Sequence, residues 1–220
     1  MSFLGYRRIL IVTAVEPERQ AVLRALSTRG TDPAVVDAVV VEVGGVGAAA
    51  VAATTARVLA TGRFDAALSV GIGGGFTVGI GGVAIASVSV AADLGADSPD
   101  GFLSLDRLGF GTSSCAADPG LVTAMTAALP GAVVGPVLTV ATVTGTAAGT
   151  REMLRRHPDA VAEAMEGFGV ATAAAQAGVA FGEVRAMSNL VGPRDRSEWR
   201  IGDAMDGLSE AVNCLAKLTM

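Results

Sequence analysis

Short continuous apolar runs alternate along the chain with longer stretches in which apolar residues recur every three or four positions. The runs are typical of strands buried on both faces of a sheet, and the spaced stretches are typical of amphipathic helices. Because the two alternate and no linker is recognisable, the pattern predicts one three-layer α/β domain over residues 1–220. The predicted strands cover 8–15, 35–43, 66–70, 83–90, 133–144 and 179–187, and the predicted helices cover 17–26, 48–60, 119–130, 146–157, 160–177 and 203–218.

Polar chemistry is concentrated between residues 160 and 201. Gly178 stands where a helix C-cap glycine is expected, and the next predicted strand brings Ser188 and Asn189 to its carboxyl end. Ligands bind at that end of open α/β sheets. Glu166 falls within the apolar predicted helix, and a buried carboxylate is costly without a partner. We therefore expect Glu166 to contact a ligand.

Composition limits the class of function. The net charge of −5 argues against nucleic acid as the main partner, because phosphate binding needs a basic surface. Two cysteines favour small buried thiols in a reducing, cytoplasmic setting over a disulfide framework. A single histidine, His157, lies far from both cysteines in the sequence, so no zinc site is expected.

Residues 66–92 carry no charge over a length that could cross a bilayer. Glycines divide this segment into two runs rich in β-branched residues, the pattern of a strand, a glycine loop and a second strand. A short apolar run after Arg8 also resembles the start of a signal peptide, but it ends at Glu16-Pro17-Glu18 without a clear cleavage pattern. We therefore expect no membrane segment.

The segment from Gly45 to Ala50 fits the dinucleotide-binding pattern G-x-G-x-x-A between a predicted strand and a predicted helix. That chemistry requires an acidic residue at the end of the following strand, whereas Asp65 precedes it. A nicotinamide enzyme is therefore disfavoured. The glycines fit either a tight turn or a close backbone approach to an anion or sugar. Residues 91–115 lack periodicity and are expected to form a surface excursion that could cover a site.

Several short motifs occur together in one order. On these motifs the chain resembles the nucleoside phosphorylase/nucleosidase superfamily over nearly its full length, and in its small size it is similar to the methylthioadenosine nucleosidases. The resemblance implies a three-layer α/β/α sandwich around a central mixed β-sheet. The matching pieces are A-x-x-x-E at 14–18, G-x-G at 45–47, the glycines of 71–75, M-E-G at 165–167 and R-A-M-S-N at 185–189.

The resemblance implies cleavage of a purine N-glycosidic bond without a cofactor or metal, in a homo-oligomer that is a dimer or a tetramer. In that assignment Glu18 activates a water, Glu166 accepts from the ribose hydroxyls, Met165 packs on the sugar and Asn189 faces the purine. The helix dipole alone could also account for a carboxylate at Glu18. The remaining substrate-binding positions that the resemblance implies are Gly73, Gly74 and Ser188.

Two positions differ from other members of the superfamily and narrow the class of substrate that the resemblance implies. Adenine-specific members carry aspartate at the position of Asn189, and an asparagine amide can donate to a 6-oxo group or to N7. This favours hypoxanthine as the leaving base, although asparagine is also an ordinary residue at a strand end. Ile72 aligns with the hydroxyl that binds phosphate in other members, and an apolar residue there favours water as the nucleophile.

The segment V-G-P-R-D-R-S-E-W at 191–199 is most similar to members whose nucleoside carries a benzoate-like carboxylate. Arg194 and Arg196 are candidates to bind that group, and Trp199 is a candidate to stack on the aryl ring. Alternatively, the charged residues pair with each other on a surface loop. Two alternative functions also stay open: a nucleosidase or phosphorylase for another purine nucleoside, and a non-catalytic nucleoside-binding module.

Overall fold

The computed structural model describes residues 3–28 and 31–217. Eight strands form the main sheet, in the order β10-β4-β8-β9-β3-β1-β2 with β7 paired to β4. The strands are β1 (Ile9–Thr13), β2 (Val39–Val43), β3 (Ala66–Gly75), β4 (Val83–Ala91), β7 (Ser114–Ala116), β8 (Val133–Thr139), β9 (Ala162–Ala164) and β10 (Ala180–Leu190).

The sheet is mixed and partly closed. β3 pairs in parallel with both β1 and β10, and it pairs antiparallel with the short β9 at Gly74 and Gly75. Since β9 also pairs with β8, β8 with β4, and β4 with β10, these five strands close into a ring from which β1 and β2 extend. The carboxyl ends of β1, β3 and β10 consequently meet on one side of the molecule.

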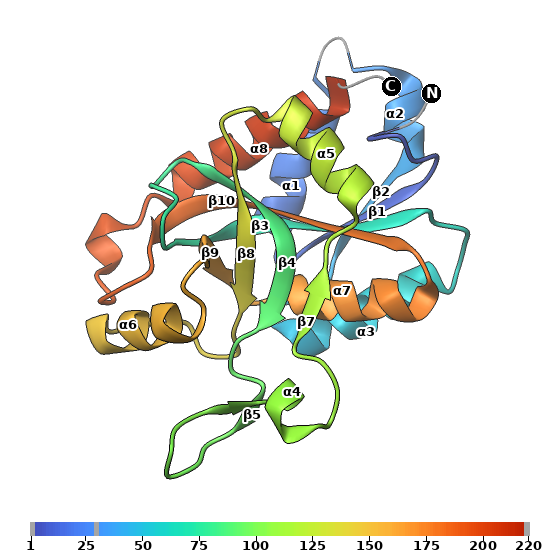
Figure 1. The fold of residues 1–220 in the computed structure, drawn as a ribbon. Helices are drawn as coiled ribbons and strands as arrows, with labels where there is room; N and C mark the ends of the chain where they lie inside the picture. The colour runs from blue at the N-terminus through green and yellow to red at the C-terminus, as the bar shows by residue number, and fades with distance from the viewer. Residues whose placement is uncertain (1–2, 29–30, 218–220) are drawn as a thin grey trace.

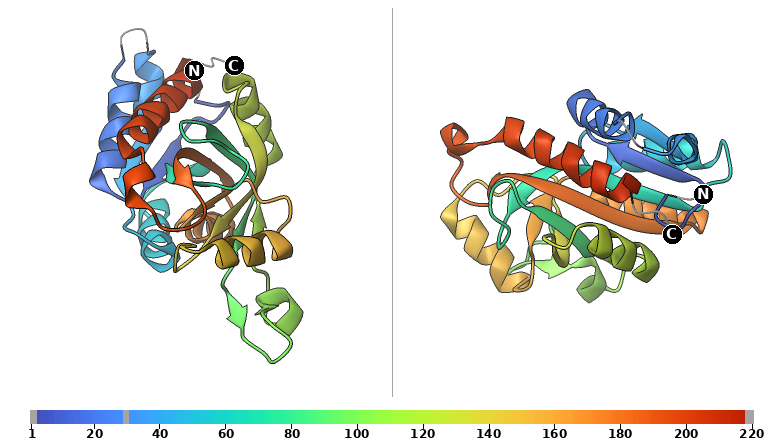
Figure 2. Two further views of the ribbon diagram at one scale, coloured as in Figure 1. Left: turned by 90° about the vertical axis from the view of Figure 1, so that its left-hand side faces the viewer. Right: turned by 90° about the horizontal axis from the view of Figure 1, so that it is seen from above.

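Helices cover both faces of the sheet (Figures 1 and 2). On one face α1 (Glu16–Leu26), α5 (Pro119–Ala128) and α8 (Ile201–Lys217) enclose the larger hydrophobic core. On the other face α3 (Ala48–Leu59) and α7 (Gly167–Ala177) pack together over β1, β3 and β10. This arrangement confirms the predicted α/β/α sandwich with a central mixed sheet. The other helical segments are α2 (Pro33–Ala38), α4 (Leu105–Leu108), α6 (Ala147–Arg156) and the 3-10 turn η1 (Arg196–Glu198).

Some predicted elements were wrong at their ends. The strand predicted from residue 35 begins at Val39, because Asp32 accepts from the Ala34 amide and Pro33 starts the short helix α2. The strand predicted over 133–144 stops at Thr139. The last helix begins at Ile201, two residues earlier than predicted, and Leu218 of its predicted apolar stripe lies outside the described residues.

Two further differences affect the site. Residues 162–164 form β9 and not the first turn of a helix, because they bridge β8 and β3. Residues 71–75 are not a loop but continue β3, since β10 pairs with them as far as Leu190, with one shift of register after Met187. Tertiary pairing overrides local propensity in both places.

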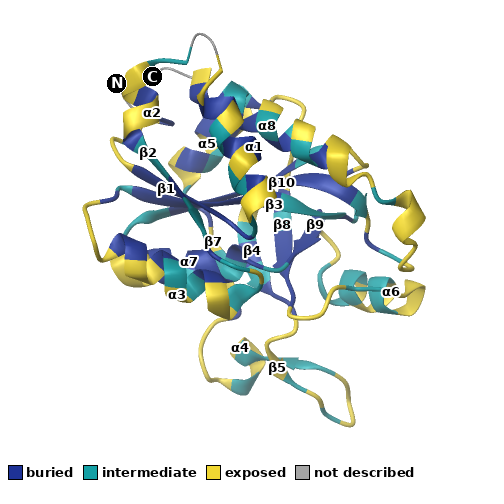
Figure 3. Cartoon of the chain, turned by 180° about the vertical axis from the view of Figure 1, so that it is seen from behind, coloured by how far each residue is buried: buried dark blue, intermediate teal, exposed yellow. Residues whose placement is uncertain are grey.

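Most of the excursion predicted over 91–115 forms a projection that extends away from the sheet (Figure 1), but Ala91 ends β4 and residues 114–115 belong to β7. The projection contains α4 and the two-stranded sheet of β5 (Gly95–Ala96) and β6 (Leu103–Ser104). None of residues 93–112 in this projection is buried, in contrast to the strands of the main sheet (Figure 3). Within residues 3–28 and 31–217, no helix is both long and apolar enough to cross a membrane.

Candidate active site

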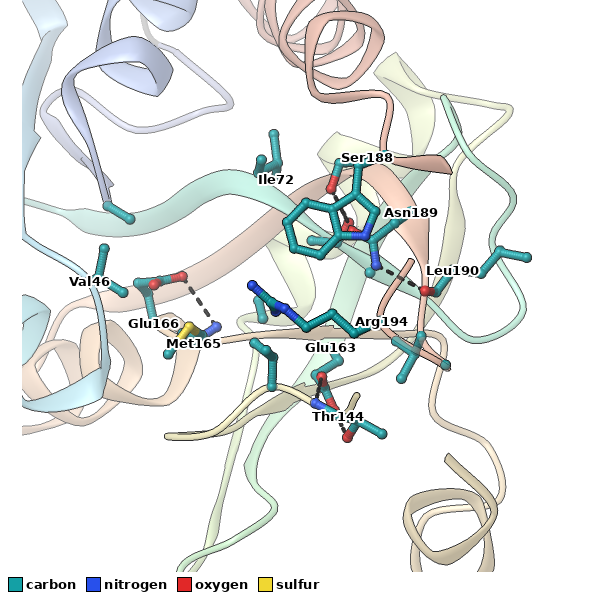
Figure 4. A pocket seen from close by; sticks show the side chains of 18 of the residues that line it. Val46, Ile72, Thr144, Glu163, Met165, Glu166, Ser188, Asn189, Leu190 and Arg194 are labelled. Carbon is teal, nitrogen blue, oxygen red and sulfur yellow. Dashed lines mark hydrogen bonds between the residues drawn. The ribbon is translucent and has the colours of Figure 1, made fainter. Parts of the chain in front are cut away.

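A cavity of about 380 Å³ opens where the carboxyl ends of β1, β3 and β10 meet the start of α7 (Figure 4). All but one of the residues predicted for the site line it. The exception is Arg196, which is exposed in η1 with its guanidinium 5.8 Å from the Trp199 ring. The lining residues that were predicted are Glu18, Gly73, Gly74, Met165, Glu166, Ser188, Asn189 and Arg194.

Glu18 is fixed by the backbone around it. It stands in the first turn of α1 and is 3 % exposed. Its Oε2 accepts from the amides of Ala14 and Val15 at 2.8 and 3.2 Å, and its Oε1 accepts from the Ile72 amide at 2.9 Å. Burial raises the pKa of Glu18, while the Ile72 amide and Arg185 act to lower it. The carboxyl is therefore a rigidly placed group with a raised affinity for a proton.

Glu166 does not lie inside a helix, as the sequence pattern predicted. It occupies the N-cap position of α7, because β9 ends just before it. Its Oε1 accepts from the Gly47 amide at 3.3 Å, and its Oε2 accepts from Arg185 Nη1 at 3.1 Å. This carboxylate is 6 % exposed and borders the cavity. The glycine turn at 45–47 therefore directs an amide at a carboxylate, which disfavours phosphate binding there.

Arg185 forms an ion pair with Glu166 and lies near Glu18, and it was not predicted as a site residue. It is fully buried, and β10 pairs it with Gly71 of β3. A β-carbon on Gly71 would lie 2.7 Å from Arg185 Nη1 and 2.7 Å from Glu18 Oε1. Burial acts to lower the pKa of Arg185, but the carboxylates of Glu183, Glu166 and Glu18 outweigh it and raise the pKa overall. The motif R-x-x-S-N contained the signal for this residue, since Arg185 precedes Ser188 and Asn189 on one strand.

Ser188 and Asn189 lie at an irregularity in the pairing of β10 with β3, where the register shifts between Met187 and Asn189. The Ser188 hydroxyl donates to Asn189 Oδ1 at 2.8 Å and also lies 3.2 Å from the Gly73 carbonyl. Asn189 Nδ2 donates to the Leu190 carbonyl at 2.9 Å. An amide NH₂ has two hydrogens, so one is left to donate to a ligand atom in the cavity.

Arg194 points toward the cavity in Figure 4. Its guanidinium lies 4.9 Å from the centre of the Trp199 ring, a cation–π distance, and its backbone amide donates to the Gly145 carbonyl. Among the described residues neither Arg194 nor Arg196 forms an ion pair, and Asp195 accepts from Ser197. The alternative of mutual pairing on a surface loop is therefore wrong.

Glu163 of β9 is a third carboxylate that lines the cavity, and the sequence did not reveal it. Its two oxygens accept from the Thr144 amide at 2.8 Å and the Thr144 hydroxyl at 2.6 Å (Figure 4). Burial raises the pKa of Glu163, against the effect of these hydrogen bonds. The two hydrogen bonds between Thr144 and Glu163 hold the loop after β8 beside the cavity. No group of three or more histidine, cysteine or acidic side chains suited to a metal occurs in the part of the chain that the structure describes.

Comparisons with known proteins identify relatives of this chain over nearly its full length. The family model of the phosphorylase superfamily matches residues 8–220. A futalosine hydrolase from Streptomyces coelicolor is 48% identical over 223 residues, covering 94% of this chain and 94% of that protein. A futalosine hydrolase from Acidothermus cellulolyticus is 45% identical, covering 94% of this chain and 89% of that protein.

Solved structures share the fold at lower identity. The 5'-methylthioadenosine/S-adenosylhomocysteine nucleosidase of Neisseria meningitidis, in complex with methylthio-immucillin-A, has a TM-score of 0.80 at 17% identity. That match covers 97% of this chain and 100% of the other. The MTA/SAH nucleosidase of Streptococcus pneumoniae, in complex with 8-aminoadenine, has a TM-score of 0.81 at 19% identity and covers 96% of this chain and 100% of the other.

Proposed function

Since the chain belongs to the phosphorylase superfamily, we propose that it hydrolyses the N-glycosidic bond of futalosine, releasing hypoxanthine and dehypoxanthine futalosine. The reaction would be a step of menaquinone biosynthesis in the cytoplasm, carried out by a single catalytic domain that needs no cofactor. The observation that supports it best is the placement of Glu18, Glu166 and Asn189 around one cavity. N-glycoside hydrolysis needs a base for water, a group that holds the ribose and a donor to the leaving base.

Glu18 and Glu166 have separate roles in this proposal. Glu18 orients a water below the sugar and accepts its proton, as the raised pKa of a buried carboxyl favours. Glu166 accepts hydrogen bonds from the ribose hydroxyls, and Met165 packs on the sugar. As the glycosidic bond lengthens, the sugar becomes oxocarbenium-like, and the two nearby carboxylates stabilise the developing positive charge.

Asn189 recognises the purine. The amide hydrogen that is not bonded to Leu190 donates to the 6-oxo group or N7 of hypoxanthine. Charge builds on the base as it leaves, so this bond strengthens in the transition state. Ser188 holds the amide in the orientation that presents this hydrogen, and the backbone of Gly73 and Gly74 leaves room for the ligand.

Water is the proposed nucleophile. Ile72 lines the cavity with an apolar side chain, and its backbone amide is already bonded to Glu18. The cation closest to Glu18, Arg185, is shared among buried carboxylates. A phosphate ion beneath the sugar would therefore lie beside the carboxylates of Glu18 and Glu166, and their repulsion costs Coulomb energy.

The substrate carboxylate is assigned to Arg194. Its guanidinium borders the cavity and has no ion-pair partner among the described residues, and the aryl ring would stack near Trp199. Arg196 stands outside the cavity lining and is a secondary candidate that could attract the carboxylate at longer range.

A homo-oligomer, dimer or tetramer, is also part of the proposal. The projection leaves Phe110 79% exposed, and an apolar hollow adjoins the cavity at Val46 and Met165. Burying such surfaces favours association. Light scattering after size-exclusion chromatography checks this, and a monomer at micromolar concentration would contradict it.

The substrate assignment is tested with futalosine, aminofutalosine, inosine and methylthioadenosine, by chromatography of the released base. Futalosine should give the highest kcat/KM. A preference for inosine or for a 6-amino nucleoside would support the alternative of another purine nucleosidase. Tight binding of futalosine without base release would favour the binding-module alternative.

A further inference from the structure

A fully buried carboxylate lies behind the cavity, on the strand that carries Arg185. Glu183 precedes Arg185 by two residues in β10, so both side chains leave the strand on the same face. Glu183 is 0% exposed and does not line the cavity. Its Oε1 accepts from Arg185 Nε at 2.9 Å, and its Oε2 has no hydrogen-bond partner within residues 3–28 and 31–217. A buried charge with so few partners is costly, and apolar packing there would be cheaper.

The surrounding backbone leaves room for this carboxylate. Gly167 is the first residue of α7, and a β-carbon there would collide with the Glu183 carboxylate. The N-terminus of a helix also favours a nearby negative charge. Gly167 directly follows Glu166, so the space for Glu183 lies beside the proposed ribose-binding residue.

Arg185 is held on three sides. Its Nε donates to Glu183, its Nη1 donates to Glu166 at 3.1 Å, and its Nη2 donates to Ser69 at 2.7 Å. A guanidinium is planar, so fixing Nε sets the direction of both terminal nitrogens. Burial raises the pKa of Glu183, and Arg185 acts against that rise.

Building on the proposed function, we propose that Glu183 is a positioning residue: by accepting from Nε, it sets the orientation in which the Arg185 guanidinium engages Glu166 and faces Glu18. Substrate does not touch Glu183. Its effect on the reaction passes through Arg185, which contacts or faces the carboxylates assigned to the ribose and to the water.

The test compares Glu183→Met with Glu183→Gln. Methionine fills similar space without an oxygen, so kcat should fall about tenfold or more while KM changes less than about threefold. Glutamine keeps an oxygen for Arg185 Nε and should hold kcat within about threefold of wild type. Leu59→Ala, a core substitution in α3 away from the cavity, controls for lost stability without changing these contacts.

The pH profile of Glu183→Gln gives a second readout. The charged groups around Glu183 are Arg185, Glu166 and, beyond the guanidinium, Glu18. Removing the Glu183 charge leaves Arg185 to act on two carboxylates, so the acid limb of kcat/KM should move to lower pH. A residue that only filled space would not move this limb, and the readout applies even if the methionine variant does not fold.

The idea is overturned if Glu183→Met keeps wild-type kcat, if Glu183→Gln loses as much kcat as Glu183→Met, or if the acid limb of Glu183→Gln is unmoved. Each variant is assayed with the nucleoside that the wild type cleaves fastest. Failure of the wild type on futalosine would therefore contradict the proposed function, whereas these three outcomes concern Glu183 alone.

Discussion

Glu18 tests the catalytic assignment at the scale of one residue. Glu18→Gln removes the proton acceptor, and kcat should fall by about 10²–10⁴-fold, the usual contribution of a general base. The variant should also lose stability, because Glu18 accepts from three backbone amides and an amide NH₂ cannot replace both oxygens. Steady-state kinetics and thermal denaturation measure the two effects. Glu16→Gln, an exposed change in the same helical turn, is the matched control and should keep wild-type kcat.

Arg194 tests the assignment of the substrate carboxylate. Arg194→Ala should raise KM for futalosine by about tenfold or more, because a charge-assisted hydrogen bond is lost. KM for inosine, which has no carboxylate, should be unchanged. Arg196→Ala should raise KM less, since its side chain does not line the cavity. If neither substitution changes KM for futalosine, the carboxylate is bound elsewhere.

The residues of the site were predictable where a motif carried them. Glu18, Glu166 and Asn189 were named from the sequence, and the structure brings them to one cavity. Glu163 and Glu183 were missed, because their partners Thr144 and Arg185 become meaningful only once β8, β9 and β10 are paired. A buried carboxylate has no periodic signal that separates it from an exposed one.

At the scale of elements, Gly71 keeps β3 compatible with the buried ion pairs beside it. Gly71→Ala places a methyl 2.7 Å from both Arg185 Nη1 and Glu18 Oε1, so both groups must shift. We expect kcat/KM to fall about 100-fold, because displacements near 1 Å have that effect, and stability to fall by about 1–3 kcal/mol.

Gly79→Ala is the matched control for that substitution. It lies in the turn between β3 and β4, and a β-carbon there meets no atom within 4 Å. Its activity should stay within about threefold of wild type. Full activity in Gly71→Ala would show that Arg185 and Glu18 need not hold their observed positions.

Elements with strong local signals were predicted well. Asp118 and Pro119 mark the start of α5, and the apolar run before Thr13 is β1. The glycines of 71–75 and the alanines of 160–164 gave the wrong element, because their conformation depends on pairing with strands distant in sequence. Local propensity carries no information on such partners.

At the scale of the whole molecule, the buried carboxyls make stability depend on pH. Burial raises the pKa of Glu18, Glu163 and Glu183 above the ordinary value of 4.5, so the folded state binds protons more readily than the unfolded chain. The stability that these carboxyls add is fully present below their pKa in the unfolded chain. It is lost as the pH rises through their higher pKa values in the folded state. The Tm should therefore rise as pH falls from 7 toward about 5.

Exposed carboxyls set the lowest pH at which the Tm still rises on acidification. Hydrogen bonds lower the pKa of Glu16, Asp106, Glu152 and Asp195, and the small stability they add is lost as pH falls through their folded values. Calorimetry between pH 4 and 8 measures the pH at which the Tm is highest. Glu183→Gln and Glu163→Gln should each flatten the slope between pH 5 and 7, and a Tm that falls steadily from pH 7 to pH 5 would contradict this account.

The most direct test of the central claim is base release from futalosine in phosphate-free buffer, followed by chromatography. Hypoxanthine should accumulate in equal amount to the futalosine consumed, at a rate that added phosphate does not increase. A requirement for phosphate would contradict the role of water beside Ile72 and Glu18. The absence of any released base would contradict the catalytic function itself.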